Sequence, residues 1–331
     1  MNEIWTIGRI LKWTENFFKE KGIESPRLDA EVLLGHVLEK ERIYLYVHFD
    51  EPLQPQELAE YREAIKQRIR RVPVAYIIGQ REFMGLTFHV TEDTLVPRPD
   101  TEILVQAAIE RLKKMSGASE APTVENAEEV AETLETAEVP ETRPVYFADI
   151  GTGTGAICLS VLHYLPQATA DTVDISPAAR KVAEENAEAL DVADRVTFYT
   201  GDLLAPLSKA QSGGAGDKAS AAEETAGARY DAILSNPPYI PDADIETLAP
   251  EVRCKEPRTA LAGGADGLDF YRRLVADSPA LIKDDGFLAV EVGIHQAQAV
   301  AKMAVESGKF ARTEIIKDYG GIERVVVVWK K

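Results

Sequence analysis

The fold class is decided by the stretch Val145-Tyr-Phe-Ala-Asp149-Ile150-Gly151-Thr152-Gly153-Thr154-Gly155-Ala156-Ile-Cys-Leu-Ser-Val-Leu162. An apolar run leads to an acidic residue and a glycine-rich turn, and apolar residues at helical spacing follow. This order predicts a buried strand, a tight turn and a helix. Glycines in such a turn allow positive φ and a close approach of the backbone to a ligand, while the helix start presents free N–H groups. We therefore expect an α/β fold with a ligand-binding turn at residues 149–155.

A second acidic residue, Asp174, closes the next predicted strand about 20 residues beyond the glycine turn. In α/β nucleotide-binding folds an acid at this place holds two ribose hydroxyls. A solvated acid at a strand end is the alternative for Asp174 taken alone. The spacing Gly151-x-Gly153-x-x-Ala156 also fits the dinucleotide fingerprint, so the turn alone does not separate NAD from S-adenosylmethionine. Asp149 favours S-adenosylmethionine, because a carboxylate directly before the turn attracts a cationic ligand and repels a pyrophosphate.

A third motif, Asn236-Pro237-Pro238-Tyr239, follows the apolar run 231–235 and is expected just past the carboxyl end of a buried strand. These residue types fit methyl transfer to a planar, conjugated NH2 group, whose nitrogen lone pair is delocalised. The Asn236 side-chain carbonyl and the Pro237 backbone carbonyl can accept the two N–H bonds of such a group and so direct its lone pair. Tyr239 offers a flat face against which the group can pack. A Pro-Pro turn capped by Asn is the structural alternative for these four residues alone.

The order of the predicted elements in the C-terminal part indicates a mostly parallel sheet. Strands alternate with helices up to residue 292, and a helix near 296–307 precedes two strands, 313–317 and 323–329, that read as a closing antiparallel pair. Such sheets bind ligands at the carboxyl ends of their strands. The glycine turn, Asp174, Asn236 and Glu291 all fall at these ends, so we expect them to share one edge of the sheet.

The first 74 residues have a different character, with amphipathic segments that begin near Ile4, at Pro26 and at Pro55. Short helices are stable only when packed together, so residues 1–74 are expected to form a small helical bundle. The basic end of the third segment, 66–71, reads as a solvated helix face or as a patch that faces a partner. Residues 75–99 are expected to form a hairpin linker, and residues 100–331 a second domain.

Two stretches of that second domain read as insertions. Residues 115–144 hold eight Glu and one Arg, which predicts a solvated, disordered segment. Residues 208–229 are rich in Ala, Gly and Ser, which predicts a flexible loop. Neither stretch carries residues that indicate chemistry.

Composition narrows the possible partners and the cellular setting. The net charge of −18 argues against a large nonspecific grip on nucleic acid, which needs Lys and Arg facing phosphates. No apolar run approaches the ~18–20 residues of a membrane span, and the first residues lack the basic start and apolar core of a secretion signal. Because Cys158 and Cys254 are the only cysteines, neither a disulfide framework nor a zinc cluster is expected. We expect a cytoplasmic monomer with no metal, no membrane contact and no direct nucleic-acid partner.

Taken together, these pieces resemble the release-factor glutamine methyltransferases, the PrmC or HemK family. The resemblance covers nearly the whole chain apart from the two insertions. The segments that carry it are Asp29-Ala-Glu31-Val-Leu-Leu34, Gly79-Gln-Arg-Glu-Phe83, Val96-Pro-Arg-Pro-Asp-Thr-Glu102, the glycine turn, Val173-Asp-Ile-Ser176, Ser235-Asn-Pro-Pro-Tyr-Ile240, Glu256-Pro-Arg-Thr-Ala-Leu261, Asp266-Gly-Leu-Asp269 and Asp318-Tyr-Gly-Gly321. The glycine turn and Asn-Pro-Pro-Tyr are shared with many methyltransferases, whereas Gly-Gln-Arg-Glu-Phe and Pro-Arg-Pro-Asp-Thr-Glu point narrowly to this family.

The resemblance implies an S-adenosyl-L-methionine-dependent protein-(glutamine-N5) methyltransferase. Its substrate would be the glutamine in the Gly-Gly-Gln (GGQ) loop of peptide-chain release factors, which act in translation termination, and its second product would be S-adenosyl-L-homocysteine. The implied fold is a Rossmann-like, seven-stranded class I methyltransferase sheet with a small N-terminal helical bundle that recognises the substrate protein.

The resemblance also implies roles for particular residues. The cofactor-binding residues would be Asp149, Gly151, Thr152, Gly153, Thr154, Gly155, Asp174, Asp202, Leu203 and Asn236, with Leu203 against the adenine. Asn236, Pro237, Pro238 and Tyr239 would hold the glutamine, and Asn236, Pro237 and Tyr239 would be the catalytic residues.

Three other functions compete with this interpretation. Asn-Pro-Pro-Tyr suits the planar amino group of adenine in DNA or RNA equally well, although such an enzyme usually needs a basic track to reach an unstacked base. Glutamine methylation of a ribosomal protein would use the same chemistry, and the sequence separates it poorly from methylation of a release factor. A catalytically idle module that binds a nucleotide would predict a broken glycine turn or a replaced Asn236, and the sequence has neither.

Overall fold

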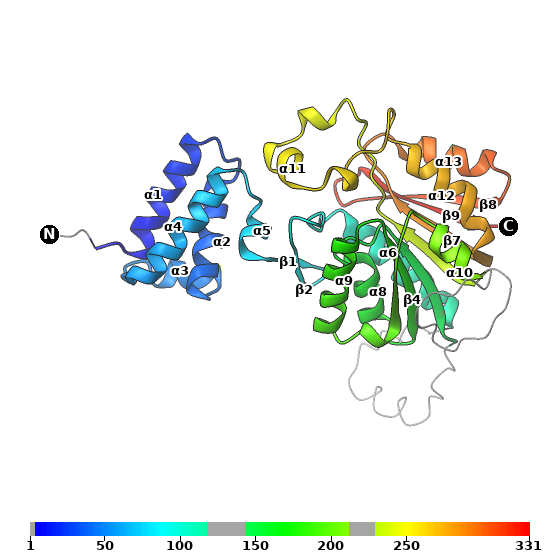
Figure 1. Cartoon of the computed structure of the whole chain (residues 1–331), viewed down its shortest axis with the longest axis horizontal. Coiled ribbons are helices and arrows are strands. Elements are labelled where there is room, and N and C mark those ends of the chain that lie inside the picture. The colour runs from blue at the N-terminus through cyan, green and yellow to red at the C-terminus, as the bar shows by residue number, and fades with distance from the viewer. Residues whose placement is uncertain (1–3, 118–142, 212–228) are drawn as a thin grey trace, which may run out of the picture.

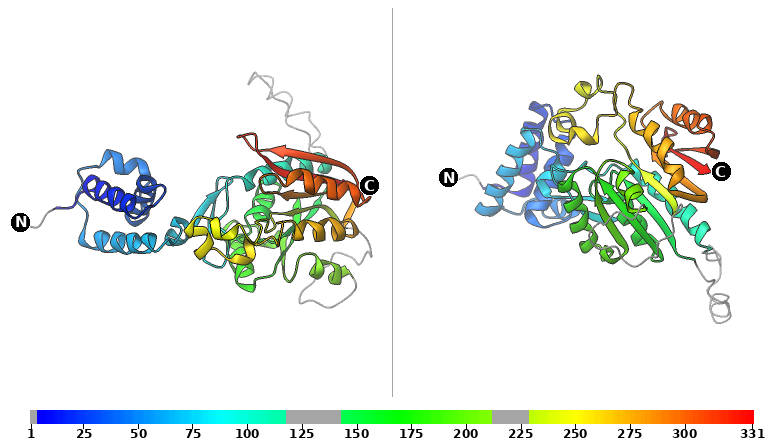
Figure 2. Two further views of the ribbon diagram at one scale, coloured as in Figure 1. Left: turned by 90° about the horizontal axis from the view of Figure 1, so that it is seen from above. Right: turned by 45° about the vertical axis from the view of Figure 1, so that its right-hand side comes forward.

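A computed structural model describes residues 4–117, 143–211 and 229–331 of the chain. A group of five helices comes first, and a seven-stranded sheet with helices on both faces follows (Figure 1). The two parts lie at opposite ends of an elongated molecule, joined through a small hairpin (Figure 2). None of the helices in the three described stretches is long and apolar enough to cross a membrane.

The N-terminal helices begin where local sequence signals favour a helix start. Their bounds are α1 Ile7–Glu20, α2 Pro26–Leu38, α3 Arg42–Val47, α4 Pro55–Ile69 and α5 Val74–Ile78. Thr6 caps α1 by accepting a hydrogen bond from the Arg9 backbone N–H, and α2 and α4 begin with proline, whose fixed φ suits the first helical position. Phe18, Leu33 and Tyr61 lie in the common core of the bundle.

The predicted hairpin is correct only in part. Strands β1 Gln80–Phe83 and β2 Leu86–His89 pair antiparallel, but the preceding residues 75–78 are helical and belong to α5. The run Val-Ala-Tyr-Ile-Ile has the composition of a strand, yet it packs as a helix against α2 and α4, so tertiary packing overrides local propensity. The hairpin itself packs on the core of the sheet domain through Phe83 and Phe88, which are 1% and 0% exposed.

The sheet confirms the predicted fold class. Its strand order is β5-β4-β3-β6-β7-β9-β8. The bounds are β3 Val145–Ile150, β4 Ala168–Asp174, β5 Val196–Thr200, β6 Tyr230–Ser235, β7 Ile282–Glu291, β8 Phe310–Lys317 and β9 Glu323–Lys330. Pairing is parallel from β5 through β7, and β9 runs antiparallel to both β7 and β8. The chain therefore moves outward from β3 first to one side and then to the other, which creates the switch point where such sheets bind ligands.

Helices cover both faces of the sheet. Their bounds are α6 Thr101–Ser116, α8 Ala156–Tyr164, α9 Pro177–Ala189, α10 Ala205–Gln211, α12 Asp269–Asp277 and α13 Ala297–Glu306, while the short helix α11 Pro250–Lys255 lies off the sheet. Residues of α6, α8 and α9 enter one buried cluster, and residues of α10, α12 and α13 enter the other. Consecutive strand residues such as Phe147 and Ala148 point into opposite clusters, as the period of two in a strand requires.

The two predicted insertions fall largely outside the described residues. Of the first, residues 118–142 are not described, while residues 115–116 are the end of α6. Of the second, residues 212–228 are not described, and residues 208–211 are helical rather than a loop. The helix α10 is anchored because Leu207 is fully buried in the core, and the Ser208 backbone N–H donates to the Leu204 carbonyl at 3.1 Å.

A buried arginine connects the bundle to the sheet domain. Arg68 of α4, which the sequence places on a solvated or partner-facing helix end, is only 5% exposed. Its Nε lies 2.7 Å from Asp29 Oδ2 in the bundle, and its Nη2 lies 2.8 Å from Glu251 Oε1 in α11. In Figure 1 and in the left view of Figure 2, α11 (yellow) lies between the bundle and the sheet. Arg68 therefore links the bundle to the segment that follows the Asn-Pro-Pro-Tyr motif.

Replacing Arg68 by methionine is expected to destabilise the protein by about 3–5 kcal/mol, because Asp29 would remain buried without its counter-charge. The free energy of unfolding can be measured by urea denaturation followed by circular dichroism. The exposed Arg70→Met is the matched control and should change it by less than about 0.5 kcal/mol. The double variant R68M/D29N should recover part of the loss, and equal effects of R68M and R70M would contradict this prediction.

Candidate active site

The hydrogen-bond register of the sheet brings three strand ends together. Ile150 of β3 lies opposite Val173 of β4 on one side and opposite Ser235 of β6 on the other. The Gly151 backbone N–H donates to the Val173 carbonyl at 2.8 Å, and the Ser235 hydroxyl donates to the Ile150 carbonyl at 2.6 Å. The glycine turn, Asp174 and Asn236 therefore leave the sheet side by side, on the edge where the sequence places them.

The glycine turn combines an open side with a packed side. Gly151, Gly153 and Gly155 have φ values of +78°, +55° and +83°, which glycine adopts far more readily than other residues. A Cβ added at Gly151 or Gly153 would meet nothing within 4 Å, whereas one at Gly155 would lie 2.6 Å from Leu159 Cδ1. The first two glycines thus leave room for a ligand, and the third lets α8 pack closely. Thr152 and Thr154, between the glycines, are both buried.

Asp149 is fully buried directly below this turn. Its Oδ2 accepts hydrogen bonds from the Thr152 hydroxyl at 2.8 Å and from the Cys158 backbone N–H at 3.3 Å. Its Oδ1 has no hydrogen-bond partner among the described residues. Burial raises the pKa of Asp149 to about 7, and the nearby Asp174 carboxylate contributes to the rise. A cationic ligand at the turn would relieve this cost by favouring the ionised form.

Asp174 is held at the end of β4 by two backbone donors. Its Oδ2 accepts from the Gly153 N–H at 2.8 Å and its Oδ1 accepts from the Ser176 N–H at 2.9 Å. Each carboxylate oxygen keeps a further lone pair with which it can accept a hydroxyl. The first of these bonds also joins Asp174 to the glycine turn, so the two parts of the candidate nucleoside site are coupled.

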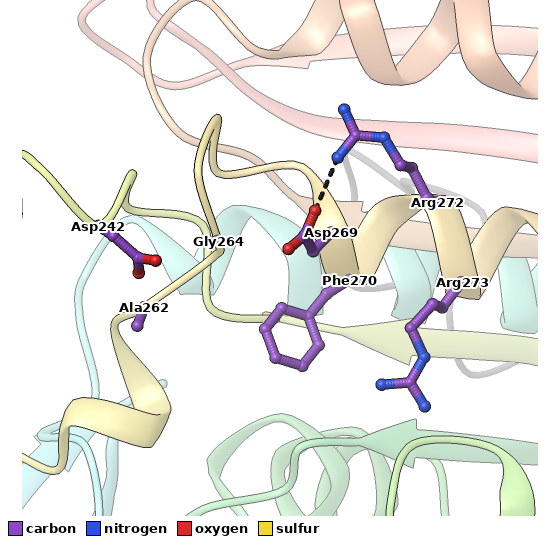
Figure 3. A pocket seen from close by; sticks show the side chains of 7 residues that line it. All are labelled: Asp242, Ala262, Gly264, Asp269, Phe270, Arg272 and Arg273. Atoms are coloured by element: carbon purple, nitrogen blue, oxygen red, sulfur yellow. Dashed lines mark hydrogen bonds and ion pairs between the residues drawn. The ribbon is translucent and has the colours of Figure 1, made fainter.

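Asp202 and Leu203 follow β5 and lie near a surface cavity beside α12. Leu203 has a φ of +48°, which is uncommon for a residue with a side chain, and it is partly buried against the core. Asp202 is exposed, and its Oδ2 lies 2.6 Å from Arg273 Nη2. Arg273 lines a cavity of about 620 Å³ beside α12. Figure 3 shows Phe270 and Arg273 on the same side of that cavity. In this structure Asp202 is therefore engaged by an arginine rather than free.

The Asn236 side chain is oriented by a residue that sequence reasoning did not assign to the site. Its Nδ2 donates to the Thr101 hydroxyl at 3.1 Å, across 135 residues of chain. This bond leaves the side-chain carbonyl Oδ1 available to accept a hydrogen bond from a ligand. Thr101 is the first residue of α6 and is 5% exposed. The motif Pro-Arg-Pro-Asp-Thr-Glu singles out this segment in the sequence, but it does not indicate which side chain faces Asn236.

The backbone of the Asn-Pro-Pro-Tyr motif is clamped by two neighbouring segments. The Ile240 N–H donates to the Leu261 carbonyl at 3.0 Å, and the Gly263 N–H donates back to the Ile240 carbonyl at 2.8 Å. The Gln296 side-chain amide donates to the Tyr239 carbonyl at 2.9 Å. Pro237 is buried, while Pro238 and Tyr239 are partly exposed. These bonds hold the motif in one conformation.

Glu291 is a second buried carboxylate at this edge, 1% exposed at the end of β7. Its Oε1 lies 3.4 Å from the Tyr239 hydroxyl, and its Oε2 has no hydrogen-bond partner among the described residues. Burial raises the pKa of Glu291 to about 7, and its contact with the Thr101 hydroxyl opposes that rise. Burial likewise raises the pKa of Tyr239. The sequence places Glu291 at a strand end but does not show that it adjoins Tyr239.

The residues at this edge fit a cationic nucleoside better than a pyrophosphate. The unpartnered Asp149 oxygen and the Asp174 carboxylate give the turn a negative character, and the space above Gly151 and Gly153 gives a ligand access to the backbone. The Asn236 carbonyl lies on the adjacent strand end. A cationic methyl donor and the planar amide that accepts the methyl group can therefore be held at neighbouring strand ends. In the described stretches, no group of three or more His, Cys, Asp or Glu side chains is arranged to hold a metal ion.

Known proteins resemble this chain over nearly its whole length. Residues 9–79 match the PrmC N-terminal domain, and residues 129–213 match the methyltransferase small domain. The release factor glutamine methyltransferase of Geobacter sulfurreducens is 41% identical over 98% of this chain and 96% of its own length. Those of Moorella thermoacetica and Rhodopirellula baltica are 39% and 36% identical, over 94% and 98% of this chain and 93% and 97% of their own lengths.

The buried Asp149 makes a pH-dependent contribution to stability. Its pKa rises from 3.8 to about 7 on folding, so its favourable contribution is complete below about pH 4 and is lost as the pH rises to about 7. Asp149→Asn cannot ionise. The unfolding free energy of the variant minus that of the native protein should therefore increase from about pH 4 to about pH 7 and then level off. Urea denaturation at several pH values tests this, and a difference that stays constant or decreases with pH would refute it.

Proposed function

The chain belongs to the release factor glutamine methyltransferase family, and from this premise we propose its reaction. The enzyme transfers a methyl group from S-adenosyl-L-methionine to the side-chain amide nitrogen of the glutamine in the GGQ loop of peptide-chain release factors. The single observation that carries the proposal is the orientation of Asn236. Its NH2 group is bound to Thr101, and its carbonyl oxygen is left to accept an N–H of the substrate beside the glycine turn.

The nucleoside side of the site is formed by residues of β3 and β4. S-adenosyl-L-methionine, when bound, supplies an electrophilic methyl group on a positively charged sulfur. Asp149 contributes negative charge below the turn, Gly151 and Gly153 provide close backbone approach, and Asp174 accepts the ribose hydroxyls. Asp202 and Leu203 are proposed to contact the base, which requires the Asp202–Arg273 ion pair to open or to turn aside.

The amide side of the site is formed by the Asn-Pro-Pro-Tyr motif. An amide nitrogen is a poor nucleophile, because its lone pair is shared with the carbonyl. The Asn236 Oδ1 and the Pro237 backbone carbonyl accept the two N–H bonds, which directs the lone pair toward the methyl group and keeps charge on nitrogen. Positioning of this kind can supply ~7–11 kcal/mol. Tyr239 and Pro238 pack against the flat carboxamide, and the proton leaves to water after transfer, so no strong base is required.

The N-terminal bundle is proposed to recognise the release factor. Its surface carries large apolar side chains, including Trp13, Ile43 and Val47, which are 46%, 65% and 71% exposed. Ile43 and Val47 lie one turn apart on α3, and neighbouring exposed apolar side chains favour a protein partner. The proposed boundaries are residues 1–74 for the bundle, 75–99 for the linker and 100–331 for the methyltransferase domain. We propose that the enzyme acts as a monomer.

The experiment that tests the function is incubation of the protein with methyl-labelled donor and purified release factor, followed by peptide mass mapping. Label on the GGQ glutamine, and none on a release factor in which that glutamine is alanine, supports the proposal. Parallel incubations with ribosomal proteins and with adenine-containing DNA or RNA cover the competing substrates. Label on one of those alone would overturn the substrate assignment.

Asn236→Ala is expected to lower the turnover number by at least ~10²-fold, because one preorganised acceptor for the amide N–H is lost. Initial rates of methyl transfer to a release factor measure the effect. The affinity of the Asn236→Ala variant for S-adenosylmethionine provides the control, and it should change much less than the turnover number. A native rate for this variant would remove Asn236 from the proposed mechanism.

Asp174→Ala is expected mainly to weaken binding of the donor, because it removes the carboxylate that accepts the ribose hydroxyls. Removal of hydrogen bonds to a charged group costs about 1.5–3 kcal/mol, or roughly 10- to 150-fold in Kd. Isothermal titration with S-adenosylmethionine measures this change. Asp194→Ala serves as the control, because Asp194 is exposed and lies just before β5, at the edge of the sheet opposite Asp174. An unchanged Kd for D174A would contradict the ribose role.

A further inference from the structure

Two sequence motifs without a role in the proposed function are joined by an ion pair. They are the Pro-Arg-Pro run at residues 97–99 and the Glu-Pro-Arg-Thr-Ala-Leu run at residues 256–261. Arg98 Nη2 lies 2.6 Å from Oε1 and 2.8 Å from Oε2 of Glu256, across 158 residues of chain. The Glu256 side chain is 1% exposed, whereas the Arg98 side chain is 37% exposed. The guanidinium therefore balances the charge of a buried carboxylate.

Residues 256–267, the clamp segment, lie directly against the backbone of the Asn-Pro-Pro-Tyr motif. The Leu261 carbonyl accepts a hydrogen bond from the Ile240 N–H at 3.0 Å, and the Gly263 N–H donates to the Ile240 carbonyl at 2.8 Å. A Cβ added at Gly263 would lie only 2.9 Å from the Pro238 carbonyl oxygen. Because the two backbones are in contact, a shift of the clamp segment must displace the motif.

A short, rigid turn connects Glu256 to these contacts. Pro257 has a fixed φ, and a single 3-10 turn follows at residues 258–260. The Leu261 and Ala262 N–H groups both donate to the carbonyl of residue 258, at 3.0 and 2.9 Å. Leu261 is also 5% exposed, so its side chain is anchored in the interior. The place of the Glu256 carboxylate therefore sets the place of the Leu261 carbonyl that holds Ile240.

The other partner of the ion pair is held just as firmly. Pro97 and Pro99 flank Arg98 and fix the φ angles on both sides of it, and the second proline also restricts Arg98 to extended backbone. The Thr101 N–H donates to the Arg98 carbonyl at 3.1 Å, and the Thr101 hydroxyl accepts from Asn236 Nδ2 at 3.1 Å. One segment thus contacts the Asn236 side chain directly and the motif backbone through the ion pair.

We propose that Arg98 and Glu256 are positioning residues, whose ion pair holds the clamp segment against the Asn-Pro-Pro-Tyr motif and thereby fixes the carbonyl oxygens that receive the substrate amide. The inference rests on the proposed function, because it concerns the same amide-binding motif. Neither residue touches the reacting atoms. Their effect on the rate comes from geometry, since a misplacement of about 1 Å can cost ~10²-fold.

Kinetics of single variants test the positioning role. At saturating donor, Arg98→Gln and Glu256→Gln are each expected to lower kcat for a release factor about 10- to 100-fold. The Kd for S-adenosylmethionine should stay near the native value, because the proposed cation and ribose sites lie at the ends of β3 and β4. Arg98→Lys should recover most of kcat, since a single nitrogen contacts both Glu256 oxygens and a point charge can take its place.

A double variant guards against a loss of folding in the single variants. R98Q alone leaves the Glu256 carboxylate buried without its counter-charge, whereas R98Q/E256Q removes both charges. Since the two substitutions break the same pair, their effects on kcat should not multiply, and the double variant should be no slower than the slower single variant. Losses that multiply would show that the two residues act independently and would contradict the proposal.

A second ion pair of the same kind provides the matched control. Arg229 Nη2 lies 3.2 Å from Oδ2 of Asp171, and the two side chains are 28% and 1% exposed. Arg229 immediately precedes β6, at the opposite end of the strand from Asn236. Arg229→Gln should therefore lower the free energy of unfolding in urea but keep the native kcat. Native kcat in R98Q and E256Q, no recovery in R98K, or an equal loss of kcat in R229Q would each overturn the positioning role.

Amide hydrogen exchange tests the inference even if the proposed substrate is wrong. The N–H groups of Ile240 and Gly263 report on the contact between motif and clamp segment, and NMR can follow both without any substrate. In the double variant they should exchange at least ~10-fold faster than in the native protein. The Gly151 N–H, bound within the glycine turn to the Val173 carbonyl, is the internal reference and should exchange at the native rate.

The two measurements separate failure of the inference from failure of the proposed function. Faster exchange at Ile240 and Gly263, together with no methylation of any release factor by the native protein, would refute the substrate alone. Native exchange at both positions in the double variant would show that the ion pair does not hold the clamp segment. That result would overturn the inference whatever the substrate is.

Discussion

Parallel pairing of β3 with both β4 and β6 is the constraint on which the whole site depends. Because Ile150 lies opposite Val173 on one side and Ser235 on the other, the turns after β4, β3 and β6, which are neighbours in the sheet, leave it at the same level. A shift of one residue in either pairing would exchange the faces of a strand. It would also move Asp174 or Asn236 away from the glycine turn. The buried core on both faces of the sheet fixes the register and thereby builds the site.

Two buried carboxylates at that edge have different neighbours. Asp149 and Glu291 each have an oxygen without a partner among the described residues, and burial raises the pKa of both to about 7. Such groups are costly, and strongly shifted pKa values gather at functional sites. Asp149 lies below an open glycine turn and suits a cation. Glu291 Oε1 lies 3.4 Å from the Tyr239 hydroxyl, within the motif proposed to hold the amide.

Ion pairs between distant segments tie the substrate motif to the rest of the molecule. Arg98, before α6, binds both oxygens of Glu256 in the loop after the motif, at 2.6 and 2.8 Å. Arg68 of the bundle reaches Glu251 in the same loop. The segment that clamps Asn-Pro-Pro-Tyr is therefore also the segment that contacts the bundle. In the proposed reaction, this arrangement keeps the bundle surface that recognises the substrate protein at a fixed position relative to the motif that holds the glutamine.

The sequence by itself determined those features that depend on neighbouring residues. Glycines fix the turn after β3, prolines start α2 and α4, and alternating strands and helices specify a mostly parallel sheet with its ligands at one edge. The hairpin predicted from the sequence was wrong for residues 75–78. These residues have the composition of a strand, but packing on the bundle makes them helical. Only the tertiary structure decided that Thr101 meets Asn236, that Glu291 meets Tyr239 and that Arg68 is buried. Hydrogen bonds and ion pairs between residues far apart in the chain depend on how the elements pack, and local sequence patterns carry no record of that packing.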